Sequence, residues 1–232
     1  MISVRGLVKH FGLKPVLRGL QFDVEEGEFV ALVGPNGAGK TTFLRILTSL
    51  ARPNAGVVTI AGHRIPGEEG PVRRMLGVVG HQTLLYGDLT AAENLRFYGR
   101  MYAIENGGRR VKEVLDLVGL ARVSGELVRS FSRGMQQRLA IARAILHKPQ
   151  LLLLDEPHTG LDQEAALMLD GLLNDVAIEG RTVVMTSHDL ARAHDLATRV
   201  DVLSRGVIAD TMSTDSVSAD DLATRYRTAT HV

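Results

Sequence analysis

The sequence predicts an α/β fold in which helices flank a mainly parallel β-sheet, with an antiparallel β-layer at the N-terminus and an inserted α-helical subdomain. Short, almost fully apolar runs alternate with segments of helical spacing, which is typical of strands buried on both faces of a parallel sheet. The N-terminal runs lie close together in the sequence, which favours antiparallel pairing among them. The middle of the chain has mainly helical patterns.

The N-terminal third is expected to contain strands and one helix. A loop that carries Phe11 separates the first two strands, and residues 42–50 have apolar side chains at helical spacing. The apolar runs that we expect to form strands are residues 2–7, 20–24, 28–33 and 56–61.

Helices dominate the middle of the chain, which follows a short buried strand at residues 76–80. Thr90, followed three residues later by Glu93, forms a capping box that begins one helix. Two further helices are expected over residues 109–118 and 133–146. The middle segment is therefore predicted to be a helical subdomain inserted between two strands of the parallel sheet.

The C-terminal third returns to buried strands that alternate with helices. The strands are expected at residues 151–154, 182–187 and 200–203, and the helices at residues 163–177 and 190–197. The tail from about Ser213 fits either a helix or a frayed end. The predicted domains are a nucleotide-binding core of residues 1–83 and 149–232 and a helical subdomain of residues 84–148.

Composition excludes several classes of protein. The formal net charge of +1 predicts no nucleic-acid partner. The absence of cysteine excludes disulfides, cysteine-ligated zinc and iron–sulfur clusters, and it fits a cytosolic location. Residues 1–6 contain no long apolar run, so we expect no signal peptide. No stretch approaches the roughly 18 apolar residues of a membrane-spanning helix.

Residues 34–41 fit the pattern G-x-x-x-x-G-K-[ST] and lie between a predicted strand and a predicted helix. Glycines allow backbone N–H groups to surround phosphates, and the helix N-terminus adds partial positive charge. Lys40 would reach the β- and γ-phosphates, and the Thr41 hydroxyl would coordinate Mg²⁺. The pattern therefore predicts a P-loop NTPase core that binds a nucleoside triphosphate.

Polar residues follow three buried strands, where they are expected to line the same edge of the sheet. Asp155 is a candidate ligand for Mg²⁺, and Glu156 a candidate general base for the attacking water. His188 is either a hydrogen-bond partner of the γ-phosphate or a structural histidine. Gln82 follows the strand before the helical segment and is a further candidate site residue.

The order of these motifs resembles that of the nucleotide-binding subunits of ATP-binding cassette (ABC) transporters over essentially the whole chain. The discriminating feature is the segment from Phe131 to Arg138, which is similar to the signature segment of that family. P-loop kinases and GTPases lack it. Here Phe131, Arg133 and Met135 replace the common Leu, Gly and Gln, whereas Ser132 and Gly134 match the family form.

The resemblance implies a role for each matching residue. It implies an ATPase with ATP and Mg²⁺ as cofactors, in which Glu156, His188 and Gln82 are catalytic and Asp162 belongs to the D-loop. The implied ATP-binding residues are Phe11, Gly34, Pro35, Asn36, Gly37, Ala38, Gly39, Lys40, Thr41 and Thr42, with Phe11 stacking on adenine. The implied Mg²⁺ ligands are Thr41, Gln82 and Asp155, and the implied signature residues are Ser132, Arg133, Gly134, Met135 and Gln136.

The resemblance also implies partners. The signature would act on the ATP of a second ATP-binding subunit, most simply a second copy of this chain, in a dimer that ATP closes. A separate transmembrane permease would carry the cargo, and the subunit would lie in the cytoplasm on the inner face of the cell membrane. The apolar stretch 84–86 would either dock that permease or fold back into the helical subdomain.

Three functions remain open at this stage. The segment from Gly80 to Leu95 resembles the haem-exporter ATPase of cytochrome c maturation, although nothing in this chain is expected to bind haem. The signature resembles equally that of drug, lipid or polysaccharide exporters. A cassette ATPase that moves no solute is the third alternative.

Overall fold

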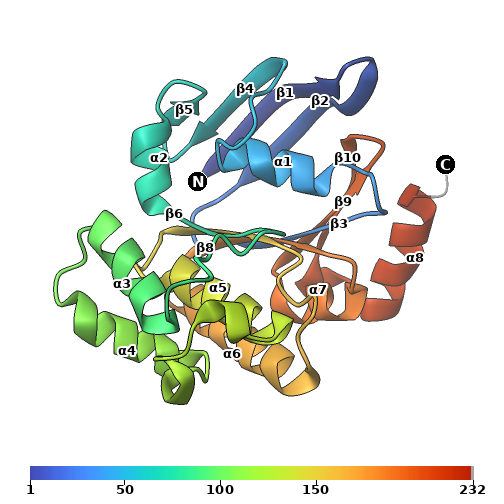
Figure 1. Ribbon diagram of the computed structural model, residues 1–232. Helices are drawn as coiled ribbons and strands as arrows, with labels where there is room; N and C mark the ends of the chain where they lie inside the picture. The colour runs from blue at the N-terminus through green and yellow to red at the C-terminus, as the bar shows by residue number, and fades with distance from the viewer. Residues whose placement is uncertain (231–232) are drawn as a thin grey trace.

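The computed structural model describes residues 1–230, so the last two residues of the predicted core segment 149–232 lie outside the described part. Figure 1 shows stacked layers: an antiparallel sheet at the top, α1 beneath it, a larger sheet in the middle and several helices below. The helices α3 and α4 lie to one side of the lower layer. The predicted fold class, including the antiparallel N-terminal layer, is confirmed.

Within residues 1–230, the strands form one four-stranded antiparallel sheet of order β2-β1-β4-β5 and one six-stranded sheet of order β10-β9-β3-β8-β7-β6. In the larger sheet, β9, β3, β8, β7 and β6 are parallel, and β10 pairs antiparallel at the edge. The strands are β1 (Ile2–Phe11), β2 (Lys14–Val24), β3 (Phe29–Val33), β4 (Ala55–Ile60), β5 (His63–Ile65), β6 (Leu76–Val79), β7 (Leu151–Asp155), β8 (Thr182–Ser187), β9 (Arg199–Ser204) and β10 (Val207–Ser213).

Helices cover both faces of the larger sheet (Figure 1). They are α1 (Lys40–Leu47), α2 (Glu69–Met75), α3 (Ala91–Met101), α4 (Gly107–Leu117), α5 (Arg133–Ile145), α6 (Gln163–Ile178), α7 (Leu190–Leu196) and α8 (Ala219–Thr230). Short 3₁₀ turns occur at Ala121–Val123, Val128–Ser130 and Thr214–Ser216. Within the described residues, no helix has both the length and the apolar character needed to cross a membrane.

The two faces of the parallel sheet enclose two hydrophobic cores. Alternate residues of β3 point to opposite faces: Ala31 belongs to the lower core, and Leu32 to the upper core between the two sheets. The lower core also contains Leu95 of α3 and Val114 of α4. The helices of the middle segment and the lower face of the sheet therefore share one continuous core.

Several element predictions are wrong in detail. The predicted loop around Phe11 is strand, because β1 continues to Phe11 and pairs with Lys14 across a tight turn at Gly12. The helix after the glycine loop ends at Leu47 instead of residue 50, because Ser49 adopts a φ of 58°.

The capping box at Thr90 is confirmed: its hydroxyl accepts from the Glu93 N–H, and the Glu93 carboxylate accepts from the Thr90 N–H.

Three elements have no counterpart in the sequence prediction: α2, β5 and β10. In α2 only Val72 is buried, and in β10 only Met212 is buried. The hydrophobic periodicity that identifies an element is therefore almost absent from both. The C-terminal tail, for which a helix was one alternative, contains α8, and Leu222 anchors this helix in the lower core.

We expect the substitution Gly77→Ala to destabilise the protein by about 1–3 kcal/mol, the usual cost of overpacking. A Cβ at Gly77 would overlap the Ala144 carbonyl oxygen and lie 2.6 Å from Leu152 Cδ2. The matched control is Gly171→Ala, because a Cβ at that position of α6 meets nothing within 4 Å. This control should stabilise by about 0.5–1 kcal/mol through helix propensity. Urea unfolding of both variants measures the difference, and equal stabilities would contradict the close packing of β6 on α5.

Candidate active site

Four neighbouring strands of the parallel sheet deliver the predicted site residues to one edge. The glycine loop follows β3, His188 follows β8, Asp155 ends β7, and Gln82 follows β6. Since β3, β8, β7 and β6 are adjacent and parallel, their carboxyl ends meet at the same edge of the sheet, where ligands bind in open α/β folds.

The glycine loop rests directly on backbone. A Cβ at Gly34 would overlap the Leu203 carbonyl oxygen of β9, and a Cβ at Gly39 would lie 2.9 Å from Leu17 Cδ2. Gly39 precedes α1 with a φ of 113°, and no side chain caps the first turn of this helix. The N-terminal N–H groups of α1 are therefore left for an anionic group.

Lys40 is buried beneath this loop, with an exposed fraction of 6%. Its Nζ donates to the Gly34 carbonyl oxygen at 2.7 Å and lies 4.0 Å from Glu156 Oε1. Burial lowers the pKa of the Lys40 ammonium, and the negative charges of Glu156 and Asp155 partly oppose that shift. The lysine thus joins the glycine loop to Glu156, as expected of a group that neutralises phosphate.

Glu156 holds an uncommon backbone conformation, with a φ of 48°. Its N–H donates to Thr186 Oγ1 at 2.9 Å, and the same hydroxyl donates to Asp155 Oδ1 at 2.7 Å. Its Oε2 atom lies 3.8 Å from His188 Nδ1. The structure therefore brings together Lys40, Glu156 and His188.

Thr186 was missed by the sequence prediction, although it fixes both carboxylate residues. It lies in β8 directly beside Asp155 in the parallel register, and it is fully buried. A threonine near the carboxyl end of a buried strand, next to the strand that ends in Asp155, is the signal that identifies it.

Two adjoining cavities connect several of the predicted residues. Thr41, Gln82, Asp155 and Glu156 all line a cavity of about 620 Å³. The hydroxyl, amide and carboxylate oxygens of Thr41, Gln82 and Asp155 are the ligand types that Mg²⁺ prefers, so this donor set fits the ion.

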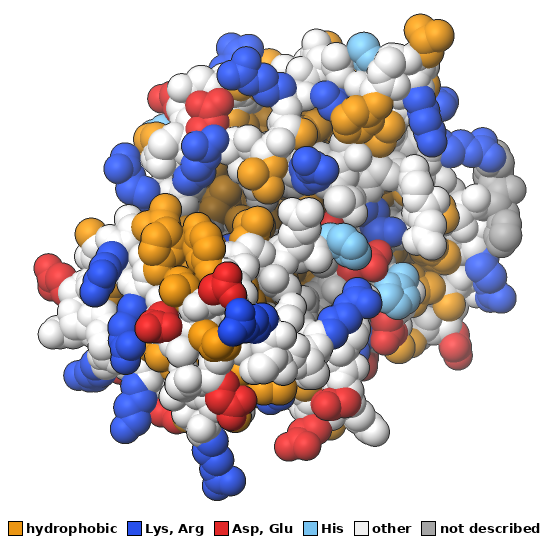
Figure 2. All heavy atoms as spheres, viewed as in Figure 1, with side chains coloured by type: hydrophobic (Ala, Val, Ile, Leu, Met, Phe, Trp, Pro, Cys, Tyr) orange, Lys and Arg blue, Asp and Glu red, His pale blue; other side chains and the backbone are white. Residues whose placement is uncertain are grey.

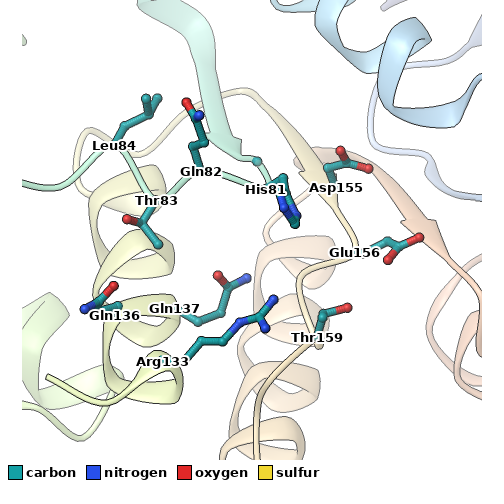
Figure 3. Close-up of a pocket in the computed structure, with 11 residues that line it drawn as sticks. His81, Gln82, Thr83, Leu84, Arg133, Gln136, Gln137, Asp155, Glu156 and Thr159 are labelled. Atoms are coloured by element: carbon teal, nitrogen blue, oxygen red, sulfur yellow. The ribbon is translucent and has the colours of Figure 1, made fainter.

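The second cavity, of about 430 Å³, shares Gln82 and Glu156 with the first and adds Arg133 and Gln136 of α5 (Figure 3). In Figure 3 the Arg133 side chain extends between α5 and the loop that carries Thr159. A Cβ at Gly160 would lie 3.2 Å from Arg133 Nε, so the arginine passes directly over this loop. Arg133 therefore occupies space beside the carboxylates of Asp155 and Glu156. The glycine that is common at this signature position would leave that space open.

Other predicted residues lie apart from these cavities. Ser132 is exposed and caps α5 by accepting from the Met135 N–H at 3.2 Å, while Met135 packs against the lower core. Asp162 caps α6 by accepting from the Ala165 N–H at 2.8 Å. The geometry of a single chain gives Ser132 and Asp162 helix-capping roles.

Phe11 is not brought to the glycine loop by any contact that the structure records. Its side chain is 57% exposed at the end of β1, and Lys9 Nζ lies 4.9 Å from the ring centroid. Within residues 1–230, no hydrogen bond or aromatic contact joins Phe11 to residues 34–42. Val16 of β2 is closer, since a Cβ at Gly39 would lie 3.4 Å from Val16 Cγ1.

For the ATP hydrolysis that the motif resemblance implies, we expect the substitution Thr186→Val to lower kcat about tenfold or more, because small displacements of catalytic groups are costly. The valine leaves the Glu156 N–H and one Asp155 oxygen without their partner. The control is Thr182→Val at the opposite end of β8, where the buried hydroxyl accepts from the Gly27 N–H at 3.0 Å. Each variant should lose about 1–3 kcal/mol of stability. Steady-state phosphate release distinguishes them: equal kcat values would contradict the role assigned to Thr186.

Comparisons with known proteins agree with this arrangement. A family model described as ABC transporter matches residues 17–159. The chain is 34% identical to the linearmycin resistance ATP-binding protein of Bacillus subtilis over 94% of its own length and 71% of that protein. It is 35% identical to a daunorubicin resistance ATP-binding protein of Streptomyces coeruleorubidus, over 94% of this chain and 70% of that protein.

Further similarity extends to export proteins and solved structures. A Nod factor export ATP-binding protein of Ralstonia nicotianae is 36% identical over 89% of this chain and 65% of its own length. A dimeric ATP-binding cassette in a post-hydrolysis state bound to ADP and Pi is 29% identical to this chain, with a TM-score of 0.85. The match covers 92% of this chain and 99% of that chain. The structure of an ATP-binding subunit of an ABC transporter matches with a TM-score of 0.89 at 29% identity, over 97% of this chain and 99% of that chain.

Proposed function

Because this chain belongs to the ABC transporter family, as an ATP-binding subunit whose hydrolysis of ATP to ADP and phosphate is coupled to transport, we propose that it powers export of a drug-like or other small molecule through a separate membrane permease. This proposal rests on one observation: most of the length of this chain is similar to resistance and export ATPases. The chain would act on the inner face of the membrane.

The proposed chemistry assigns one task to each group at the sheet edge. Lys40 and the N–H groups of α1 bind the phosphates of ATP. Thr41, Gln82 and Asp155 would hold Mg²⁺, which would supply positive charge to neutralise the phosphates. Glu156 accepts a proton from water as the water oxygen bonds to the γ-phosphorus and the bond to the β-phosphate oxygen breaks, releasing ADP and phosphate. His188, 3.8 Å from Glu156, donates to the γ-phosphate.

The proposed dimer gives a use to residues that face away from the cavities. Ser132 is exposed at the N-terminus of α5, where a partner's ATP can accept hydrogen bonds from the first turn. Two copies in head-to-tail arrangement would each supply the other's signature residues. The similarity to a dimeric cassette bound to ADP and Pi supports this assembly.

An exposed apolar patch favours a permease as the third component. It consists of Leu84, Tyr86, Phe97 and Met101, with exposed fractions of 49%, 50%, 38% and 68%. The rings of Tyr86 and Phe97 pack edge to face with centroids 5.1 Å apart, so the patch is ordered. Figure 2 shows hydrophobic side chains gathered beside α3 on this face. Neighbouring Leu85 packs on the lower core, so only Leu84 and Tyr86 of the stretch 84–86 are left for docking.

A second candidate cargo system is the haem exporter of cytochrome c maturation. It rests on the resemblance of the segment from Gly80 to Leu95, which includes the capping box at Thr90. The three relatives described above are named for resistance or Nod factor export, which favours the first candidate.

The test is recovery of the tagged Glu156→Gln chain, with ATP, from detergent-solubilised native membranes, followed by mass spectrometry. We expect a multi-span permease to co-purify, and cytochrome c maturation factors beside it would favour the haem candidate. The variant Met101→Glu should lose the permease, whereas Ile178→Glu, at an exposed apolar residue of α6, should retain it. Recovery without any membrane protein would contradict the transport function.

A further inference from the structure

A partly buried polar cluster lies next to the proposed catalytic base. His158 is two residues beyond Glu156, and its Nε2 lies 2.7 Å from Oδ1 of Asp170 in α6. The other oxygen of the same carboxylate lies 3.2 Å from Nε of Arg192 in α7. The side chains of the three residues are only 13%, 19% and 26% exposed. Three separate elements therefore meet at one carboxylate.

The protonation pattern of this cluster is defined by its partners. An ionised carboxylate only accepts hydrogen bonds, so the proton of a neutral His158 must sit on Nε2 and point to Asp170. Burial lowers the pKa of His158, while Asp170 opposes the shift; Arg192 and Asp189 are the other charged groups that act on it. In a neutral or a protonated ring alike, an Nε2–H pointing to Asp170 satisfies this carboxylate. The contact therefore fixes the orientation of the ring.

One end of the cluster holds the loop that follows Glu156. Gln137 of α5 donates to the Pro157 carbonyl oxygen at 2.9 Å, and Thr186 holds the Glu156 N–H. His158 supplies the third anchor, through its contact with Asp170 of α6. A residue other than glycine with a φ of 48°, as at Glu156, persists only where its surroundings hold it there.

The other end of the cluster reaches the helix behind His188. Asp189 follows His188 directly and caps α7, and its Oδ1 accepts from the Arg192 N–H at 3.1 Å. The side chain of Arg192 then returns to Asp170. An unbroken chain of contacts therefore runs from the loop after Glu156, through Asp170, to the cap of the helix after His188.

We propose that His158, Asp170 and Arg192 form a positioning cluster that keeps Glu156 and His188 in register for ATP hydrolysis. The inference rests on the roles proposed above for Glu156 and His188. None of the three residues touches the substrate; His158 acts through the loop and Arg192 through the helix cap. The cluster links the two groups from behind, whereas their own side chains approach only to 3.8 Å.

The test compares His158→Ala with His158→Gln, because the glutamine amide nitrogen can take the place of Nε2 as a donor. For His158→Ala we expect kcat to fall about tenfold, with KM for ATP changed less than about twofold, since ground-state binding is untouched. His158→Gln should restore most of kcat. The control is His194→Ala in α7, whose ring bonds the Val217 carbonyl outside the cluster and whose loss should leave kcat unchanged.

A double-mutant cycle with His188→Ala separates positioning from mere loss of stability. If the cluster acts by aligning Glu156 with His188, then His158→Ala should cost little further in the His188→Ala background. An equal loss in both backgrounds, or a kcat of His158→Ala within about twofold of wild type, would overturn the proposal. Where His158→Ala does not fold, Arg192→Lys provides the same cycle from the other end of the cluster.

Glu156→Gln distinguishes this proposal from the function on which it rests. If Glu156→Gln hydrolyses ATP at the wild-type rate, the role of Glu156 is wrong and the positioning cluster has nothing to position. If Glu156→Gln is inactive while His158→Ala keeps its kcat, only the cluster is wrong.

Discussion

Replacing Glu156 by glutamine is expected to lower kcat at least about a hundredfold, the usual contribution of a general base. The amide cannot accept the proton of the attacking water, yet it keeps the size of the side chain and its place 4.0 Å from Lys40. ATP binding should therefore persist. In the proposed dimer hydrolysis would release the closed state, so the variant should accumulate as an ATP-bound dimer.

Phosphate release and size-exclusion chromatography with ATP measure the two effects. Glu164→Gln, at the exposed start of α6, is the matched control and should turn over normally. Adding Ser132→Arg to Glu156→Gln should abolish the dimer, because the arginine obstructs the exposed N-terminus of α5. A Glu156→Gln protein with normal kcat would show that another group activates the water.

The second large effect is expected from Lys40→Ala, which should weaken ATP binding by about ten- to a hundredfold, as expected for loss of a charged hydrogen-bond donor. The substitution also leaves the Gly34 carbonyl oxygen and Glu156 without the buried ammonium between them. Titration with a fluorescent ATP analogue measures the affinity. Lys112→Ala, on the exposed face of α4, serves as the control. Unchanged affinity would contradict the assignment of the phosphate loop.

Much of the fold was predictable because the buried strands are short and apolar. The runs that became β3, β7 and β8 have no other stable place than the middle of a sheet with helices on both faces. The end of β1 was not predictable, since the pairing of Phe11 with Lys14 depends on the hairpin turn at Gly12. Weakly amphipathic elements such as α2 give almost no periodic signal.

The candidate site was predictable where a residue type carries the chemistry. Lys40, Asp155 and Glu156 fall in motifs whose spacing has a physical reason. Thr186 and Asp170 have no such motif, because their importance comes from strand register and from a contact between elements distant in the sequence. Phe11 shows the opposite case: a matching residue type for which no contact with the loop is recorded.

The continuous lower core has a consequence for cooperativity. Leu95 and Val114 of the helical segment pack into the same apolar interior as Met185 of β8. Unfolding of α3 and α4 would expose the apolar lower face of β7 and β8, the strands next to Asp155 and His188. The helical segment is therefore expected to unfold together with the sheet and not before it. A permease that docks at α3, as proposed above, would therefore act on the sheet edge through this shared core and not through an independently folded helical unit.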